Sequence, residues 1–163
     1  MKRSAKSPTA VSPESTAKQL AGFIARFDPS IAKLVRAARV VLRKRYFHTA
    51  VELVYDNYNA LAIAFGPTER ASEAIVSLAV YARGVNLYFI YGATLSDPRQ
   101  LLEGSGNRGR FIRLEDISVL DRPEVEALLR AAIQDGEPPL PATGRGYTVI
   151  KAVSAKQRPR RPG

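Results

Sequence analysis

The 163-residue sequence contains no cysteine and no tryptophan, and it has one histidine. Without cysteine, the chain can form no disulfide, no thiolate metal site and no cysteine nucleophile. The single histidine, His48, rules out a multi-histidine metal site, and the sequence shows no companion group for acid–base catalysis. No run approaches the roughly 18 apolar residues of a membrane span. We therefore expect no catalytic residues, no metal site, no cofactor and no membrane partner.

Acidic residues are few relative to basic ones, 15 against 25, so the net charge is +10. Such a surplus favours anionic partners, namely nucleic acid, phosphorylated metabolites or anionic lipid, although it can equally serve solubility. The N-terminus, Met1–Lys6, carries positive charge without an apolar run behind it, which is not the pattern of a secretory signal. We expect a cytoplasmic protein.

Both ends of the sequence are poor in apolar side chains. Residues 1–12 are mostly Lys, Ser, Thr, Ala and Pro, and residues 137–163 combine Pro and Gly with basic residues and have no acidic residue after Glu137. Such compositions predict disordered basic tails. Val149 and Ile150 are the exception, since they could form a brief docked segment. The remaining residues, 13–136, form one predicted domain.

Apolar side chains at helical spacing predict several helices. The first opens at Ser12-Pro13, and the second runs from Asp28-Pro29 to Lys44 with apolar and basic residues on opposite arcs. Asp97-Pro98 predicts a short helix ending at Gly104. The capping-box pattern Asp121–Glu124 opens a closing helix that ends near Asp135-Gly136.

The middle of the chain alternates between apolar and polar, or large and small, side chains, as strands do. The predicted strands are residues 51–55, 58–65, 74–81, 85–91 and 110–114. Short connections between them favour antiparallel hairpins. The predicted fold class is α+β, an antiparallel β-sheet with helices packed on one side.

Three segments carry a resemblance to a known family. They are Val51–Asn57, where a strand ends in a Tyr turn; Val85–Gly92, an aromatic strand; and Gly104–Arg113, a Gly-rich turn into a basic strand. In order and spacing they resemble the YdhG-like domain family, a bacterial group of mostly unknown function. The resemblance implies an antiparallel sheet with helices on one side. It also implies kinship with frataxin-like proteins and the iron-chaperone role assigned to one member, although this chain is basic where frataxin-type chaperones are acidic.

Gly104, Gly106 and Gly109 match the spacing of a dinucleotide-binding fingerprint. That motif requires a preceding strand and a following helix, and here the predicted order is reversed. A glycine loop with Arg110 and Arg113 could still hold a small anion through backbone amides and guanidinium groups. The alternative is an ordinary glycine turn with surface arginines.

Two sets of candidate binding residues follow. A small anionic ligand or a protein partner is expected to contact aromatic, amide and guanidinium side chains near the sheet: Tyr55, Asn57, Tyr88, Arg110 and Arg113. Nonspecific nucleic-acid binding is the alternative, through the basic face of the second helix and the C-terminal tail: Arg36, Arg39, Arg43, Lys44, Arg158, Arg160 and Arg161. Iron delivery is a third alternative, from the family resemblance alone.

Overall fold

A computed structural model describes residues 12–162 of the chain. The helices are α1 (Pro13–Ala25), α2 (Pro29–Arg45) and α3 (Pro123–Asp135), with short 3-10 helices η1 (Ala71–Glu73), η2 (Gly92–Thr94) and η3 (Ile117–Asp121). The strands are β1 (Val51–Asp56), β2 (Leu61–Gly66), β3 (Val76–Tyr81), β4 (Gly84–Phe89), β5 (Arg110–Leu114) and β6 (Thr148–Val153).

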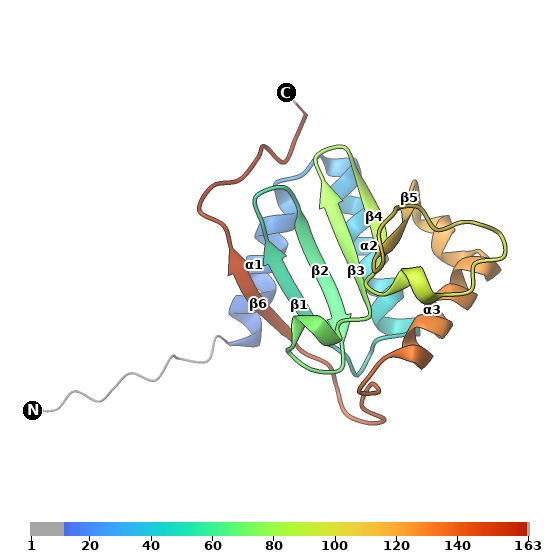
Figure 1. The fold of residues 1–163 in the computed structure, drawn as a ribbon. Coiled ribbons are helices and arrows are strands. Elements are labelled where there is room, and N and C mark those ends of the chain that lie inside the picture. The colour runs from blue at the N-terminus through green and yellow to red at the C-terminus, as the bar shows by residue number, and fades with distance from the viewer. Residues whose placement is uncertain (1–11, 163) are drawn as a thin grey trace, which may run out of the picture.

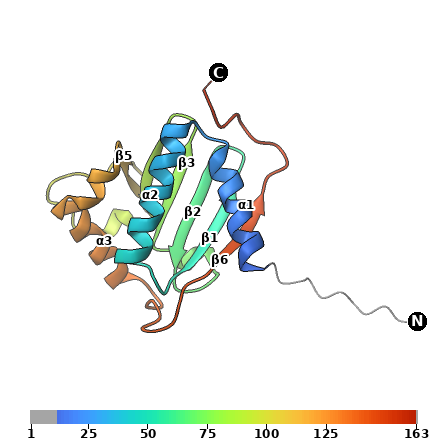
Figure 2. The same cartoon turned by 180° about the vertical axis from the view of Figure 1, so that it is seen from behind.

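The six strands form one mixed sheet in the order β5-β4-β3-β2-β1-β6. Neighbouring strands from β1 to β5 are antiparallel, as the short β1–β2 and β3–β4 connections require for those two pairs, while β6 lies parallel to β1. The helices lie on one side of the sheet, with α1 and α2 across its back (Figures 1 and 2). The predicted α+β class with helices on one side is therefore confirmed.

Large apolar side chains at alternate strand positions form the core against the helices. In β2 these are Leu61, Ile63 and Phe65, and they pack with α2 residues such as Val35 and Leu42. The opposite positions of β2, Ala62 and Ala64, point away from the helices, because successive side chains of a strand face opposite ways. The predicted alternation is confirmed, and no α-helix of the described residues covers the second face of the sheet.

Of three predicted helix-start signals, Ser12 acts as predicted, whereas Asp121 and Asp97-Pro98 do not. Ser12 caps α1 as predicted, its hydroxyl accepting from the Ser15 amide at 3.1 Å. Asp121 does not cap α3; its carboxylate accepts a hydrogen bond from Arg45 at 2.8 Å. The helix predicted after Asp97-Pro98 is wrong. The Asp97 carboxylate accepts hydrogen bonds from the Leu101 and Leu102 amides, and Gln100 adopts a φ of 54°, which a helix does not allow.

The prediction of a disordered C-terminal tail is wrong for residues 148–160, whereas the docked segment predicted at Val149 and Ile150 is confirmed as part of β6. Residues 148–153 pair with β1, whose outer edge would otherwise expose a row of unpaired amides and carbonyls. Beyond β6, Arg160 is 4% exposed and donates to the buried carboxylate of Asp56 at 2.7 Å. A buried carboxylate needs a cation, which explains why this basic segment is ordered. The predicted N-terminal tail lies outside the described residues, apart from Ser12.

Within residues 12–162, no helix is both long and apolar enough to cross a membrane.

Candidate functional site

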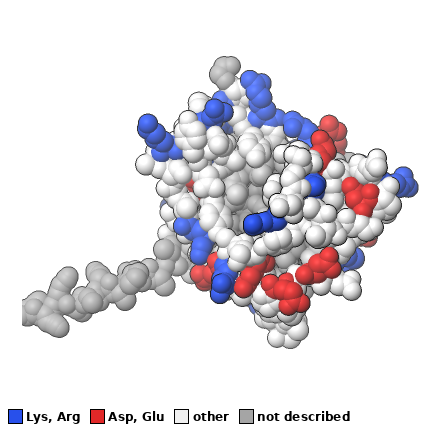
Figure 3. Space-filling view, in the orientation of Figure 1, with Lys and Arg blue, Asp and Glu red and all other residues white. Residues whose placement is uncertain are grey.

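The side chains that alternate away from the helices make up what we call the open face of the sheet. They are Val51, Leu53 and Tyr55 of β1; Ala62 and Ala64 of β2; Ser77, Ala79 and Tyr81 of β3; Asn86 and Tyr88 of β4; Phe111 and Arg113 of β5; and Val149 of β6. Figure 3 looks onto this face and shows it hollowed near its centre.

One cross-strand row forms the floor of this hollow. In register across the sheet it consists of Tyr55, Ala62, Ala79, Asn86 and Arg113. The two alanines stand in the middle strands and remain partly exposed, so solvent reaches the floor there. With neighbouring strands about 4.8 Å apart, the backbones of Tyr55 and Asn86, which flank the two alanines, are roughly 14 Å apart. A flat group fits between them.

Two chain segments border the hollow. The η1 segment lies against the lower end of β2, where a Cβ on Gly66 would stand only 2.9 Å from the Ala74 Cα. On the β4 side, the glycine-rich loop packs on Tyr88, since a Cβ on Gly109 would collide with the Tyr88 hydroxyl. The glycine at 109 thus allows the loop to cover that ring. Tyr88 forms a wall of the hollow and not its floor.

Three side chains of the row are polar, and they differ in how far a ligand can reach them. The Asn86 Oδ1 atom is buried and has no hydrogen-bond partner among the described residues. An unsatisfied buried acceptor costs about 1–3 kcal/mol, so Asn86 is a point of unrelieved polar cost beneath the row. The exposed Arg113 guanidinium makes one long bond, 3.3 Å, to the Arg83 carbonyl, which leaves its other donors free for an anion. Burial raises the pKa of the Tyr55 hydroxyl, which stays a neutral donor near pH 7.

A polar pocket of about 760 Å³ continues the open face beyond the upper ends of β2 and β3. Its lining includes the exposed rings of Tyr58 and Tyr81, the turn residue Asn57, and Arg158. The Arg158 guanidinium carbon lies 5.9 Å from the centre of the Tyr58 ring, within cation–π range. Aromatic, amide and guanidinium groups therefore meet at this end of the sheet.

The structure brings some of the predicted ligand residues together and separates others. Tyr55, Tyr88 and Arg113 share the open face, and Asn57 lies at its upper end. Arg110 has the opposite alternation in β5. Its guanidinium donates to the carbonyls of three loop residues, Ser105, Gly106 and Gly109, at 2.7–3.2 Å. Arg110 thus holds the glycine loop closed.

The alanine floor and the pocket beyond it were not among the predicted site residues. Ala62 and Ala79 could have been found from strand alternation alone, because they stand between Tyr55 and Asn86 in the expected pairing. The contact between Arg158 and Tyr58 had no signal, since it joins the sheet to a segment expected to be disordered.

Three of the predicted nucleic-acid arginines serve internal ion pairs. Arg39 and Arg43 of α2 contact the fully buried Glu52 carboxylate at 2.7 and 3.1 Å. Arg160 pairs with Asp56, as described above. The other four predicted residues, Arg36, Lys44, Arg158 and Arg161, are exposed.

The pKa of the Glu52 carboxyl reflects this arrangement. Burial alone would raise it, but hydrogen bonds from Arg39 and Thr148 and the charge of Arg43 outweigh burial, so the pKa lies below its ordinary value. Glu52 is therefore a stable anion that organises α2, β1 and β6, and its two arginines are not available to phosphates.

No three His, Cys, Asp or Glu side chains within residues 12–162 are grouped so as to hold a metal ion. His48 is exposed at the connection between α2 and β1. The chain matches no family model, no curated protein and no solved structure.

Proposed function

We propose that this protein is a noncatalytic binding domain whose open sheet face holds a small anionic ligand with a flat ring. The observation that supports it best is the row of Tyr55, Ala62, Ala79, Asn86 and Arg113, a small-residue floor between polar and aromatic side chains. Small-molecule sites commonly combine a concave, mostly apolar surface with a few placed polar groups. The YdhG-like resemblance accords with a role other than catalysis.

The charge of the ligand follows from the cations around the hollow. Arg113 stands at one end of the row, and Arg158 lines the pocket beyond the upper ends of β2 and β3. Both side chains are exposed. Guanidinium groups bind carboxylates and phosphates through two parallel hydrogen bonds. A ligand whose ring lies on the alanine floor between Tyr55 and Tyr88, and whose acidic group reaches one of the two arginines, would use both the floor and the cations of the site.

Adenosine monophosphate is a suitable probe because it combines a flat ring with a phosphate. Titration into the ¹⁵N-labelled protein is expected to shift the amide resonances of residues 62, 79, 81, 86 and 113. Arg113→Ala and Arg158→Ala should each weaken binding by about tenfold, the value of a charge-assisted hydrogen bond. Arg36→Ala, an equally exposed arginine on α2, is the matched control and should leave affinity unchanged.

Two results would count against this assignment. If the amide resonances of α2 shifted while those of the open face did not, the ligand would bind outside the open face. Equal losses in Arg36→Ala and Arg113→Ala would indicate general charge attraction and no built site. Inorganic phosphate, titrated alone, separates the contribution of the anion from that of the ring.

Accessory nucleic-acid binding is the second candidate. It is supported by the stacked pair of Arg158 and Tyr58 at the end of the open face, because single strands bind through aromatic stacking and arginine contacts. Anisotropy with a fluorescent oligo-dT strand at two salt concentrations tests it. Salt-independent affinity, or affinity unchanged in Arg158→Ala, would contradict it.

Iron delivery remains an implication of the family resemblance alone. Calorimetry with ferrous ion under anaerobic conditions tests it, and absence of heat would dismiss it.

A further inference from the structure

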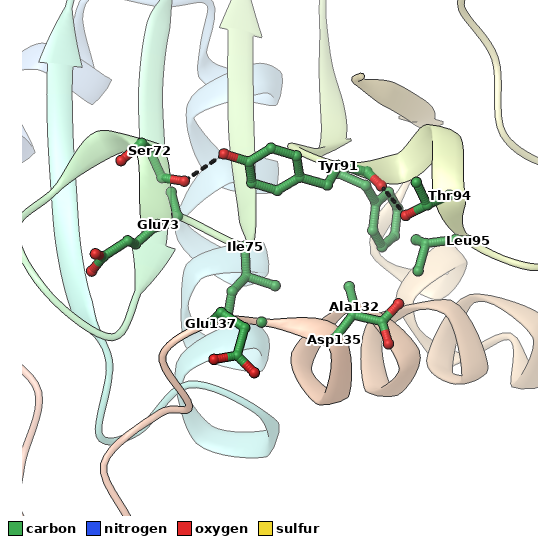
Figure 4. A pocket seen from close by; sticks show the side chains of 12 residues that line it. Ser72, Glu73, Ile75, Tyr91, Thr94, Leu95, Ala132, Asp135 and Glu137 are labelled. Atoms are coloured by element: carbon green, nitrogen blue, oxygen red, sulfur yellow. Dashed lines mark hydrogen bonds between the residues drawn. The ribbon is translucent and has the colours of Figure 1, made fainter. Parts of the chain in front are cut away.

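A second cavity, of about 400 Å³, lies at the lower end of the sheet, between η1, η2 and the C-terminal end of α3 (Figure 4). Its apolar wall includes Ile75, Leu95 and Ala132. This volume is within the usual range for small-molecule sites. The cavity is separate from the hollow of the open face and shares no lining residue with the pocket around Arg158.

Hydrogen bonds hold the walls of this cavity in place. The Tyr91 side chain crosses it, and its hydroxyl donates to the Ser72 carbonyl of η1 at 2.5 Å. The Thr94 hydroxyl donates to the Tyr91 carbonyl at 3.0 Å. The Tyr91 side chain thus joins η1 to the segment that contains η2 across the cavity.

The charge around the cavity is opposite to that of the whole molecule. The last turn of α3 contains no basic residue; instead Asp135 ends the helix and Glu137 follows it. Carboxylates at a helix C-terminus face the negative end of the helix dipole, which is unfavourable. Neither carboxylate forms an ion pair or a hydrogen bond within residues 12–162, although the chain has 25 Lys and Arg residues. Figure 3 shows acidic side chains gathered at this lower end.

The individual carboxylates are placed differently. Figure 4 shows Asp135 beside Ala132 and directed toward Leu95, whereas Glu73 and Glu137 stand at the rim and point outward. Glu73 is also engaged by the Thr68 hydroxyl at 2.5 Å and by Arg70 at 3.5 Å. Asp135 is therefore the carboxylate best placed to meet a cation in the cavity.

The Tyr91 ring adds a second attraction for positive charge. It is 43% exposed, and the Arg108 guanidinium carbon lies 6.0 Å from its centre. The Arg108 guanidinium therefore stands near the cavity, and an entering ammonium group would share the ring with it. Aromatic ring faces attract ammonium groups that lie within about 6 Å of the ring centre.

We propose that this cavity binds a small organic ammonium ion with an apolar body. The ammonium group pairs with Asp135 near the end of α3, and the apolar body covers Ile75, Leu95 and Ala132. The proposal is independent of the function proposed for the open face, since it concerns different residues and a ligand of opposite charge.

Phenethylamine is the probe, with phenylethanol and phenylacetate as neutral and anionic controls of the same shape. Titrations monitored by amide resonances are expected to show saturable binding of phenethylamine at residues 75, 91, 95 and 135. The neutral and anionic analogues should bind at least about tenfold more weakly, because a charge-assisted hydrogen bond is lost.

Asp135→Asn tests the residue directly and should weaken phenethylamine binding by about tenfold. Because the substitution removes an unfavourable charge from the end of α3, its melting temperature should be equal or higher, which separates a binding effect from misfolding. Glu115→Gln, an exposed carboxylate after β5, is the matched control and should bind like the wild type. Equal binding of phenylethanol, undiminished binding by Asp135→Asn, or no saturable binding of phenethylamine would overturn the proposal.

Discussion

Removal of the Arg160 side chain is expected to destabilise the protein far more than removal of an exposed arginine. The side chains of Arg160 and Asp56 are 2% and 1% exposed, and their charged atoms lie 2.7 Å apart. The same guanidinium also donates to the Asn57 carbonyl at 2.6 Å and lies 5.6 Å from the Phe27 ring centre. The pair therefore joins the C-terminal segment to β1 and to the helix layer.

The expected magnitude follows from what remains after the substitution. In Arg160→Met, the Asp56 carboxylate stays buried with only Gln157 at 2.8 Å and the half-exposed Arg26 at 3.6 Å as partners. Breaking a buried ion pair from one side typically costs about 3–5 kcal/mol. The double variant Asp56→Asn, Arg160→Met should be less destabilised than the sum of its single variants, because no uncompensated charge is left behind.

Urea denaturation followed by circular dichroism measures these free energies of unfolding. Arg45→Met is the matched control, since the Arg45–Asp121 pair has a similar distance, 2.8 Å, but is 44% and 59% exposed. Exposed pairs contribute about 0–1 kcal/mol. If Arg160→Met cost no more than Arg45→Met, the C-terminal segment would not be held by this ion pair and the reasoning would be refuted.

Three further predictions concern stability. The pKa of Glu52 lies below its ordinary value, so its contribution is complete above about pH 4.5 and is lost as pH falls through the lowered pKa; the acid decline in unfolding free energy should be shallower in Glu52→Gln. Gly22→Ala, in α1 with nothing within 4 Å of the new Cβ, should stabilise by about 0.5–1 kcal/mol in urea melts, and a loss would contradict the helix. Gly109→Ala should cost about 1–3 kcal/mol and shift the ring resonances of Tyr88, since its Cβ collides with that side chain; unchanged resonances would mean that the loop does not cover Tyr88.

Local patterns predicted the central sheet because its alternation is a property of neighbouring residues. Strand β5 was predicted with its exact bounds, and the shared face of Asn86 and Tyr88 follows from counting positions along β4. The grouping of Tyr55 with Arg113 needed only the strand order. These parts of the fold and of the candidate site are readable without long-range information.

The remaining parts depend on contacts between distant segments. Val149 and Ile150 predicted only a brief docked segment within a basic, proline-containing tail, and the full length of β6 is explained by the unpaired edge of β1. The Arg160–Asp56 pair has no local signature at all. The cavity beside α3 likewise combines η1, η2 and the helix end, three segments that no sequence window contains together.

The position of β6 has a consequence for synthesis of the chain. Its partner β1 is the first strand to be synthesised, and β6 is the last. The outer edge of β1 therefore stays unpaired until Val149 has been synthesised and can lie beside Leu53. Until then Glu52 lacks its hydrogen bond from Thr148, and Asp56 lacks its hydrogen bond from Arg160. A growing chain would therefore pass through a five-stranded intermediate with an unprotected border, and the interval before its closing strand emerges is when strand-to-strand association between neighbouring nascent chains is most favoured.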